Sequence, residues 1–355
     1  MKTMLANTKE IEFDAVSPKN LYLFLYDEVL MKHKEIFKYC SEFDISREIV
    51  APSRRDYDEL NELLLQIHEK YDIDMNVNYA QLYLWQKCFL GKTNDEAILA
   101  ASYLVKFCVM ADCILDSTCF SEKQKMYVCK KSNLLLRQTD SKGEFPELDR
   151  LLSGFLNYMH MQKDDVFFSK EILKRTLWKA FQSEIYMYKS KIDFSEDIKE
   201  KTLSLLVDKS IEFEKAAFIV SLYGNNNETS VLAAELLGKV FWLVDDLCDF
   251  IDDIKAGRKN SLLIYCADKE TFGSFEERLE NVFKNMNRAV NELENTLRKL
   301  RNYVDEPFFC FLVVLIWNWF EPVRIAVQSN ERQCSRPINK EKNDGKPGNV
   351  RGKSE

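Results

Sequence analysis

The stretch that decides the fold is FWLVDDLCDFIDDIKAGRKNSLL, residues 241–263. At the 100° rotation per residue of an α-helix, all of its aspartates fall within one arc of about 120°. Apolar residues fill the opposite arc. The aspartates are Asp245, Asp246, Asp249, Asp252 and Asp253. The stretch therefore predicts a helix with one apolar face and one acidic face, and the acidic face carries far more charge than solubility requires.

Composition favours helices throughout the chain. The 355 residues include only 10 Gly and 7 Pro, and the turns of sheet-rich folds need more of both. The chain is 46% hydrophobic, which is ample for a large core. We therefore expect an all-α protein, a single large bundle of roughly ten to twelve helices.

Helical periodicity marks the expected elements along the chain. They cover residues 20–40, 57–71, 95–116, 122–137, 147–162, 169–191, 196–223, 228–255, 274–304 and 307–328. The most hydrophobic run, 308–320, is too short to span a bilayer and is interpreted as a buried core helix. Residues 329–355 are polar and aperiodic, so we expect one domain over 1–328 and a disordered tail over 329–355.

Charge and cysteine usage exclude several protein classes. The net charge of −7 argues against a nucleic-acid partner, which requires a basic face. The ten cysteines contain no CxxC pair, and the N-terminus has no apolar signal core. A reduced, cytoplasmic protein without a transmembrane segment is expected. The oligomeric state stays open, a homodimer included.

The acidic face raises a chemical question. Like charges about one turn apart repel, and this cost disappears only when they are fully solvated or bind a cation. A solvated helix face is the ordinary explanation. An oxygen-rich cluster also suits Mg²⁺, a hard ion that keeps several waters and favours sites shared with phosphate.

A second acidic pair favours the metal explanation. Asp112 and Asp116 share one helical face at the end of the most apolar predicted helix, where buried carboxylates need a partner. Phe241 and Trp242 lie one turn before Asp245 and Asp246, so the acidic face of that helix continues into apolar surface. Cationic residues lie near both clusters: Lys209, Arg258 and Lys259. A substrate with a diphosphate head and a hydrocarbon tail fits this gradient.

These residues resemble a known family, the trans-isoprenyl diphosphate synthases and the related class I terpene synthases. LLGKVFWLVDDLCDFIDD resembles the family's second motif, G-x-x-F-Q-x-x-D-D-x-x-D-x-x-x-D, with Gly238 as its glycine. FQSEIYMY, with Gln182, resembles the helix of the GQ element, and DKSIEFEKAAF resembles the Lys-Thr element. Order and spacing agree over about Ala100–Leu263.

The resemblance implies the class I terpenoid synthase fold around a central apolar pocket, and Mg²⁺-triggered ionisation of an allylic prenyl diphosphate with three ions. It implies these metal ligands: Asp112, Asp116, Asp245, Asp246, Asp249 and Asp253. Of these, Asp112, Asp116, Asp245 and Asp249 are the expected catalytic residues. The expected substrate contacts are Lys209, Arg258, Lys259, Gln182, Phe107, Cys108, Phe241 and Trp242.

Departures from the family pattern shape the functional expectation. The first motif is D-C-x-x-D, with Cys113 in place of an aspartate, and no paired arginines follow it. The N-terminal G-K-R-x-R-P element is absent, and Trp242 replaces the glutamine of the second motif. With the second-substrate site missing, we expect a terpene cyclase, a carbon–oxygen lyase. The alternatives are a prenyltransferase and, as a third hypothesis, a non-catalytic partner subunit.

Two questions concern the apolar side chains. Aromatic faces stabilise carbocations, and Phe241, Trp242, Trp317 and Trp319 are candidates, although Trp317 and Trp319 fit core packing as well. Phe107 is either a pocket wall below Asp112 or a core residue between helices.

Overall fold

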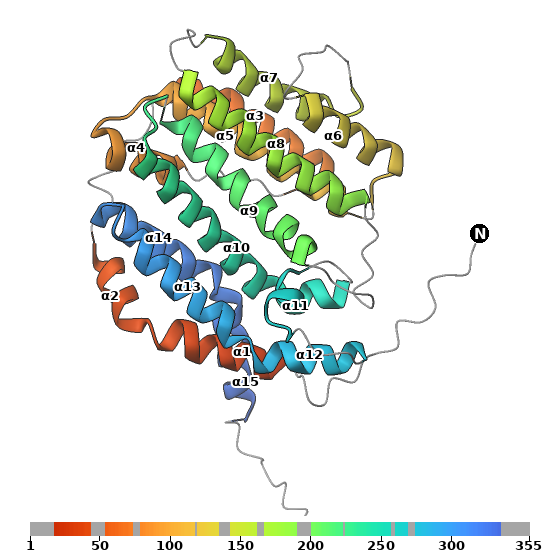
Figure 1. Ribbon diagram of the computed structural model, residues 1–355, viewed down its shortest axis with the longest axis vertical. Helices are drawn as coiled ribbons and strands as arrows, with labels where there is room; N and C mark the ends of the chain where they lie inside the picture. Colours follow the sequence, from red (N-terminus) through yellow and green to blue (C-terminus); the bar gives the residue numbers. More distant parts are fainter. Residues whose placement is uncertain are drawn as a thin grey trace, which may run out of the picture.

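The computed structural model describes residues 18–43, 54–73, 79–117, 119–134, 143–161, 167–189, 200–222, 224–256, 260–268 and 274–334. Within these ranges every regular element is a helix and no β-strand occurs (Figure 1). The all-α expectation is confirmed.

The N-terminal half contains α1 (Pro18–Leu25), the π-helical segment η1 (Tyr26–Met31), α2 (Lys34–Glu42), α3 (Arg54–Tyr71), α4 (Tyr79–Leu90), α5 (Asp95–Asp116), α6 (Glu122–Leu134) and α7 (Pro146–Met161). The C-terminal half contains α8 (Phe167–Lys189), α9 (Glu200–Ser221), α10 (Glu228–Ala256), α11 (Leu262–Tyr265), α12 (Phe275–Lys284), α13 (Asn287–Leu300), α14 (Glu306–Trp319) and α15 (Glu321–Cys334).

Two of the long predicted helices agree closely with the structure, whereas the longest one, 274–304, is divided into α12 and α13. Helix α5 has the predicted bounds, and α10 ends one residue past its predicted end. The predicted helix over 307–328 is divided at Phe320 into α14 and α15, which are bent by 44°. Pro322 lacks a backbone N–H and cannot continue the preceding helix. Helices α4 and α11 were not predicted.

The C-terminal boundary also differs from the expectation. Helix α15 continues to Cys334, past the expected end of the domain at 328. The rest of the predicted tail, 335–355, lies outside the described residues. The division into one domain and a disordered tail therefore stays a prediction.

Helix α9 lies at the centre of the arrangement that positions the two acidic motifs. It packs against α5, α8 and α10, and Figure 1 shows α8, α9 and α10 side by side. Gly238 allows α9 and α10 to approach closely, because a Cβ there would lie 2.7 Å from the carbonyl oxygen of Ile211. Helices far apart in sequence thus share one neighbourhood.

Helix α5 is the core helix of the bundle. Its N-terminus is capped by Asn94, whose side-chain oxygen accepts a hydrogen bond from the Ala97 N–H at 3.0 Å. Among the described residues, α5 is the one unbroken helix long and apolar enough to cross a membrane, and the bent pair α14–α15 passes the same test jointly. Two thirds of the α5 segment is buried inside the bundle. That burial is typical of a core helix, and it leaves Asp112 near the helix end.

Candidate functional site

The structure brings the two acidic motifs together around one lysine. Lys209 on α9 donates a charged hydrogen bond to Asp112 on α5. The pKa of Asp245, on α10, is shifted by the charges of Asp112 and Lys209 as well as by neighbouring aspartates on its own helix. Motifs that are distant in sequence therefore form one electrostatic site, with α9 supplying its cation.

Asp245 carries the clearest electrostatic signature of this site. Burial of its carboxyl and the charges of Asp246, Asp249 and Asp112 together raise its pKa to about 8, while the charge of Lys209 opposes this shift. Its side chain nevertheless remains accessible to solvent. A cation bound here would reverse the repulsion that disfavours the ionised carboxylate.

Asp246 faces a different set of partners from Asp245. One of its carboxylate oxygens accepts hydrogen bonds from Trp242 Nε1 at 2.9 Å, from the Ser261 N–H at 3.2 Å and from the Ser261 hydroxyl. Burial raises its pKa to about 6, and the hydrogen bonds from Ser261 and Trp242 work in the opposite direction. This carboxylate is engaged in fixing the turn after α10, where the sequence predicts a metal ligand.

Asp253 and Asp252 were predicted to share one acidic helix face, but their side chains have different partners. The Asn260 side-chain amide donates to Asp253 Oδ2 at 3.0 Å and to the Asp246 carbonyl at 2.8 Å. Asp252 is exposed and lies 3.9 Å from Lys255, a pair of small energetic weight. Asp253 therefore contacts the turn after α10, and the metal-binding roles of Asp245, Asp249 and Asp253 stay predictions.

Asn260 and Ser261 contact acidic residues of α10, and the sequence analysis did not predict these contacts. Both are fully or almost fully buried, and buried polar groups need hydrogen-bond partners. The one sequence signal for these contacts was that two polar residues directly precede the apolar residues of α11. Nothing in the helical periodicity of α10 shows that this turn folds back onto its aspartates.

Several predicted site residues have simple placements. Gln182 is half-buried on α8, and Cys108 is buried on α5 before Asp112. Asp116 ends α5, but its side chain lies outside the described residues. Arg258 and Lys259 also lie outside them. Their roles stay predictions.

The predicted aromatic residues have different surroundings. Trp242 is buried, tied to Asp246 and packed edge-on against Tyr265 at a centroid distance of 5.5 Å. Trp317 stacks on Phe37 at 4.0 Å, beside a different cavity. Phe241 and Trp319 are paired at 5.8 Å. The two α14 rings therefore pack in different directions, and the role of any of these four rings in stabilising a cation stays a prediction.

Phe107 lies in the core. Its side chain is 0% exposed and packs edge-on against Phe181 on α8 at a centroid distance of 5.9 Å. The structure therefore agrees with the packing alternative for this residue. The central apolar pocket expected from the family resemblance stays a prediction.

A polar pair that was not predicted lies between α5 and α9. Lys106 is buried on α5, and its charge acts on Glu214 of α9. Burial raises the pKa of Glu214 to about 7, while Lys106 lowers it. The interior next to the Asp112 helix is consequently polar in part.

The donor set fits a hard divalent cation shared with phosphate. Asp112, Asp245 and Asp249 offer carboxylate oxygens, which Mg²⁺ prefers. Among the described residues, no group of three or more His, Cys, Asp or Glu side chains is arranged to hold a metal ion by itself. Mg²⁺ usually takes one or two carboxylates and completes its shell with waters and substrate phosphates. The site fits that mode of binding and not a preformed protein cage.

Comparisons with known proteins give a fold-level likeness. No family model matches the chain, and no curated protein matches its sequence. A polyprenyl synthase from Caulobacter crescentus CB15, complexed with calcium and isoprenyl diphosphate, is similar over 83% of this chain and 96% of its own, at 14% identity and a TM-score of 0.42. A geranyltransferase from Legionella pneumophila is similar over 86% and 99%, at 12% identity and a TM-score of 0.43. Likenesses of this strength support no inference about activity, which is proposed below from the residues.

The raised pKa of Asp245 predicts a pH-dependent stability. Its folded pKa lies above the ordinary value of 3.8, so between about pH 4 and pH 8 the unfolded chain has lost this proton while the folded chain keeps it. This group therefore lowers the free energy of unfolding as pH rises through that window. Asp245→Asn removes the effect, and its melting temperature relative to wild type is expected to rise from pH 4 to pH 8.

The measurement is thermal unfolding by circular dichroism, in EDTA, at several pH values. Asp252→Asn serves as the matched control, because Asp252 is exposed on the same helix. A difference between Asp245→Asn and wild type that is constant across this pH range would contradict the assigned cause.

Proposed function

We propose that this protein is a metal-dependent enzyme that acts on an allylic prenyl diphosphate. The observation that supports it most is that the charge of Asp112 from α5 acts on Asp245 of α10, on which Asp249 of the same helix also acts. Such a group of carboxylates, with a lysine between the helices, suits a diphosphate bridged by divalent cations. The apolar core beside it suits a hydrocarbon tail.

The residues have distinct roles in this proposal. Asp112, Asp245 and Asp249 would hold Mg²⁺, which would supply positive charge to a leaving diphosphate. Lys209 is paired with Asp112, and its flexible ammonium can turn to a diphosphate oxygen when a cation takes its place. Asp116, Arg258 and Lys259 are further contacts implied by the family resemblance.

Asp246 and Asp253 position the site without facing it. Their hydrogen bonds to Ser261 and Asn260 fix the turn that follows α10. Because Asp246 lies next to Asp245 on the same helix, this anchoring also restricts the rotation of the metal-facing carboxylate. In this proposal they act through geometry and not through the metal.

Transfer of the prenyl group to an acceptor is favoured over cyclisation. In transfer, the bond between the prenyl carbon and the diphosphate oxygen breaks with its electron pair leaving on the diphosphate. The acceptor then bonds to that carbon and releases a proton. Cyclisation needs a dry, aromatic-lined pocket, whereas Trp242 is hydrogen-bonded to Asp246 and Trp317 stacks on Phe37. The buried pair Lys106–Glu214 offers polar groups next to the Asp112 helix.

Cyclisation remains the second candidate for one specific reason. Cys113 replaces an aspartate of the first motif, and the N-terminal basic element that binds isopentenyl diphosphate in the related synthases is absent. A non-catalytic subunit is the third candidate, and the retention of Asp112, Asp245 and Asp249 argues against it.

One assay separates the three candidates. Purified protein and Mg²⁺ are incubated with allylic diphosphates of increasing length, with and without isopentenyl diphosphate, and products are identified by mass spectrometry. Longer prenyl diphosphates that require isopentenyl diphosphate support transfer, whereas hydrocarbons formed without it support cyclisation. No release of diphosphate from any substrate, compared with an EDTA control, would refute both enzymatic candidates.

A further inference from the structure

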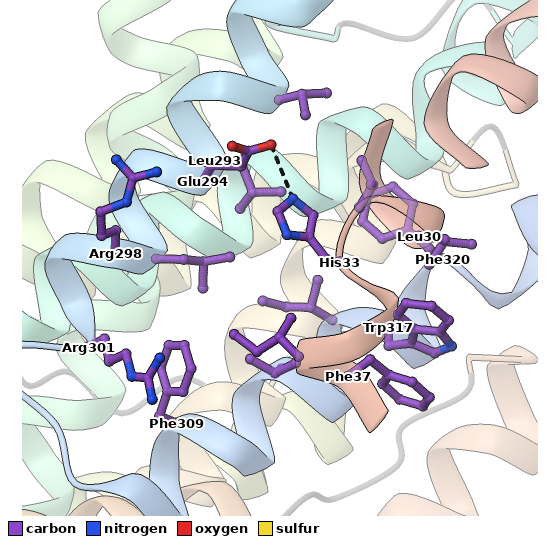
Figure 2. Close-up of a pocket in the computed structure, with 16 residues that line it drawn as sticks. Leu30, His33, Phe37, Leu293, Glu294, Arg298, Arg301, Phe309, Trp317 and Phe320 are labelled. Atoms are coloured by element: carbon purple, nitrogen blue, oxygen red, sulfur yellow. Dashed lines mark hydrogen bonds and ion pairs between the residues drawn. The ribbon is translucent and has the colours of Figure 1, made fainter. Parts of the chain in front are cut away.

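A second concave site lies away from the aspartates. It is a partly open cavity of about 250 Å³ lined by residues of η1, α2, α13 and α14 (Figure 2). None of the predicted metal-binding or catalytic residues lines it. The function proposed above does not use this cavity.

The larger part of the cavity is apolar. Figure 2 shows Phe37, Trp317 and Phe320 along one side, facing the side chains that α13 contributes from the other. An apolar cavity of about 150 Å³ holds a benzene molecule, so this one has room for a hydrocarbon of about ten carbons. Such a lining offers too few polar partners for a cluster of ordered waters.

Helix α13 gives the cavity one charged edge. Glu294, Arg298 and Arg301 follow one another at helical spacing, so they lie on the same face of α13. Lys32 Nζ lies 2.6 Å and His33 Nε2 3.1 Å from Glu294 Oε1. Burial raises the pKa of Glu294, but the hydrogen bonds from Lys32 and His33 outweigh it and hold that pKa below its ordinary range. The charge of Glu294 is therefore already balanced by its own cationic partners.

Of the two arginines at this edge, Arg301 is already paired with a carboxylate and Arg298, within the described residues, is not, so the edge keeps a positive charge. The Arg301 guanidinium lies over the Phe309 ring, 4.8 Å from the ring centroid. One of its nitrogens lies 3.2 Å from a carboxylate oxygen of Glu306. Arg298 donates to the Asn295 side-chain oxygen at 3.4 Å and has no carboxylate partner among the residues that the structure describes. A guanidinium presents a planar fork of donors that matches a carboxylate or phosphate.

We propose that this cavity binds a single-chain amphipathic anion. Its hydrocarbon tail, of about ten carbons, fills the space between α2, α13 and α14. Its oxyanion head, a carboxylate or a phosphate, is held by Arg298 and Arg301. Because the ligand bridges an N-terminal helix and two C-terminal helices, binding stabilises the folded chain. The proposal goes beyond the proposed enzymatic activity and does not depend on it.

Calorimetric titration tests the proposal on the full-length protein. EDTA is present throughout, so the aspartates cannot recruit a phosphate through a metal. The probes are decanoate and decyl phosphate, with decanol as the tail without charge and butyrate and inorganic phosphate as heads without a tail. Saturable binding of either charged decyl probe, with binding of decanol, butyrate and phosphate at least about tenfold weaker, is expected. The stronger of the two charged probes identifies the head group.

Variants place the binding at this cavity. Arg298→Gln combined with Arg301→Gln is expected to weaken the charged decyl probes about tenfold or more. Lys299→Gln, on the same helix but outside the cavity lining, is the matched control and should bind like wild type. Val313→Trp fills the apolar part and should abolish binding, provided that its circular dichroism is unchanged. If that variant fails to fold, the exposed arginine pair still decides the question.

Three results would overturn the proposal. They are the absence of saturable binding by either charged decyl probe, equal binding of decanol and decanoate, and unchanged binding in the double arginine variant.

Discussion

Replacing Asp245 by Asn is expected to reduce turnover of the allylic diphosphate about 10²–10³-fold or more while leaving the helical content unchanged. The side chain is accessible to solvent and surrounded by like charges, so its loss removes a metal ligand without opening a cavity. Asp112→Asn, on α5, should reduce turnover to a similar extent. The measurement is diphosphate release with Mg²⁺, together with circular dichroism.

Asp246 supplies the contrast within the same motif. Asp246→Ala leaves the buried donors of Trp242 and Ser261 without their acceptor, which costs about 1–3 kcal/mol of the free energy of unfolding for such a group. Asp252→Asn, exposed on the same helix, should leave both stability and turnover close to wild type. Replacing Asp245 is therefore expected to lower turnover at unchanged stability, whereas replacing its neighbour Asp246 is expected to lower stability.

Two results would contradict this assignment. Loss of helical content in both Asp245→Asn and Asp112→Asn would show that these carboxylates are structural. Wild-type turnover in both would remove the metal site from the proposed function.

The parts of the fold that could be predicted are those with strong local periodicity. Helices α5 and α10 have long apolar faces bounded by clear signals, so their ranges agree with the prediction. Breaks inside apolar stretches were missed. The division at Phe320 depends on Pro322 and on how α14 and α15 pack, and tertiary packing has no local signature.

The candidate site could be predicted only to the level of helix faces. Helical spacing places all the aspartates of α10 on one arc, and it cannot show that Asn260 and Ser261 fold back to engage two of them. The ion pair between Lys209 and Asp112 was not predicted either, because it depends on how α9 packs against α5. Contacts made by turns and by distant helices decide which predicted residues face the site.

The cavity between α2, α13 and α14 shows the same limit. Phe37 and Trp317 stack although they lie at opposite ends of the chain. Each belongs to an ordinary amphipathic or apolar helix, and nothing in either segment alone indicates a shared cavity. The sequence shows that these residues are apolar, but only the packing of the helices places them beside Arg298 and Arg301.

Phe107→Ala is expected to lower the free energy of unfolding by about 3–5 kcal/mol, the usual cost of removing a fully buried phenylalanine. The ring is 0% exposed and packs edge-on against Phe181, so its truncation leaves a cavity between α5 and α8. Aromatic pairs of this geometry add to the loss. Chemical denaturation, monitored by circular dichroism, measures the change.

Cys108 provides the matched control for the pocket-wall alternative. It follows Phe107 on the same helix but lies about 40° from the face of Asp112, one turn earlier. Cys108→Ala should cost only about 1 kcal/mol, whereas Cys108→Phe should shorten the range of accepted allylic diphosphates if the tail runs along that face. Product profiling is therefore applied to all three variants. If Phe107 lined the substrate path instead, Phe107→Ala would extend the range of substrates at nearly unchanged stability, and the core assignment would be wrong. A loss of stability with an unchanged product pattern would place Phe107 between α5 and α8, and would leave the Cys108 face as the route for the hydrocarbon tail.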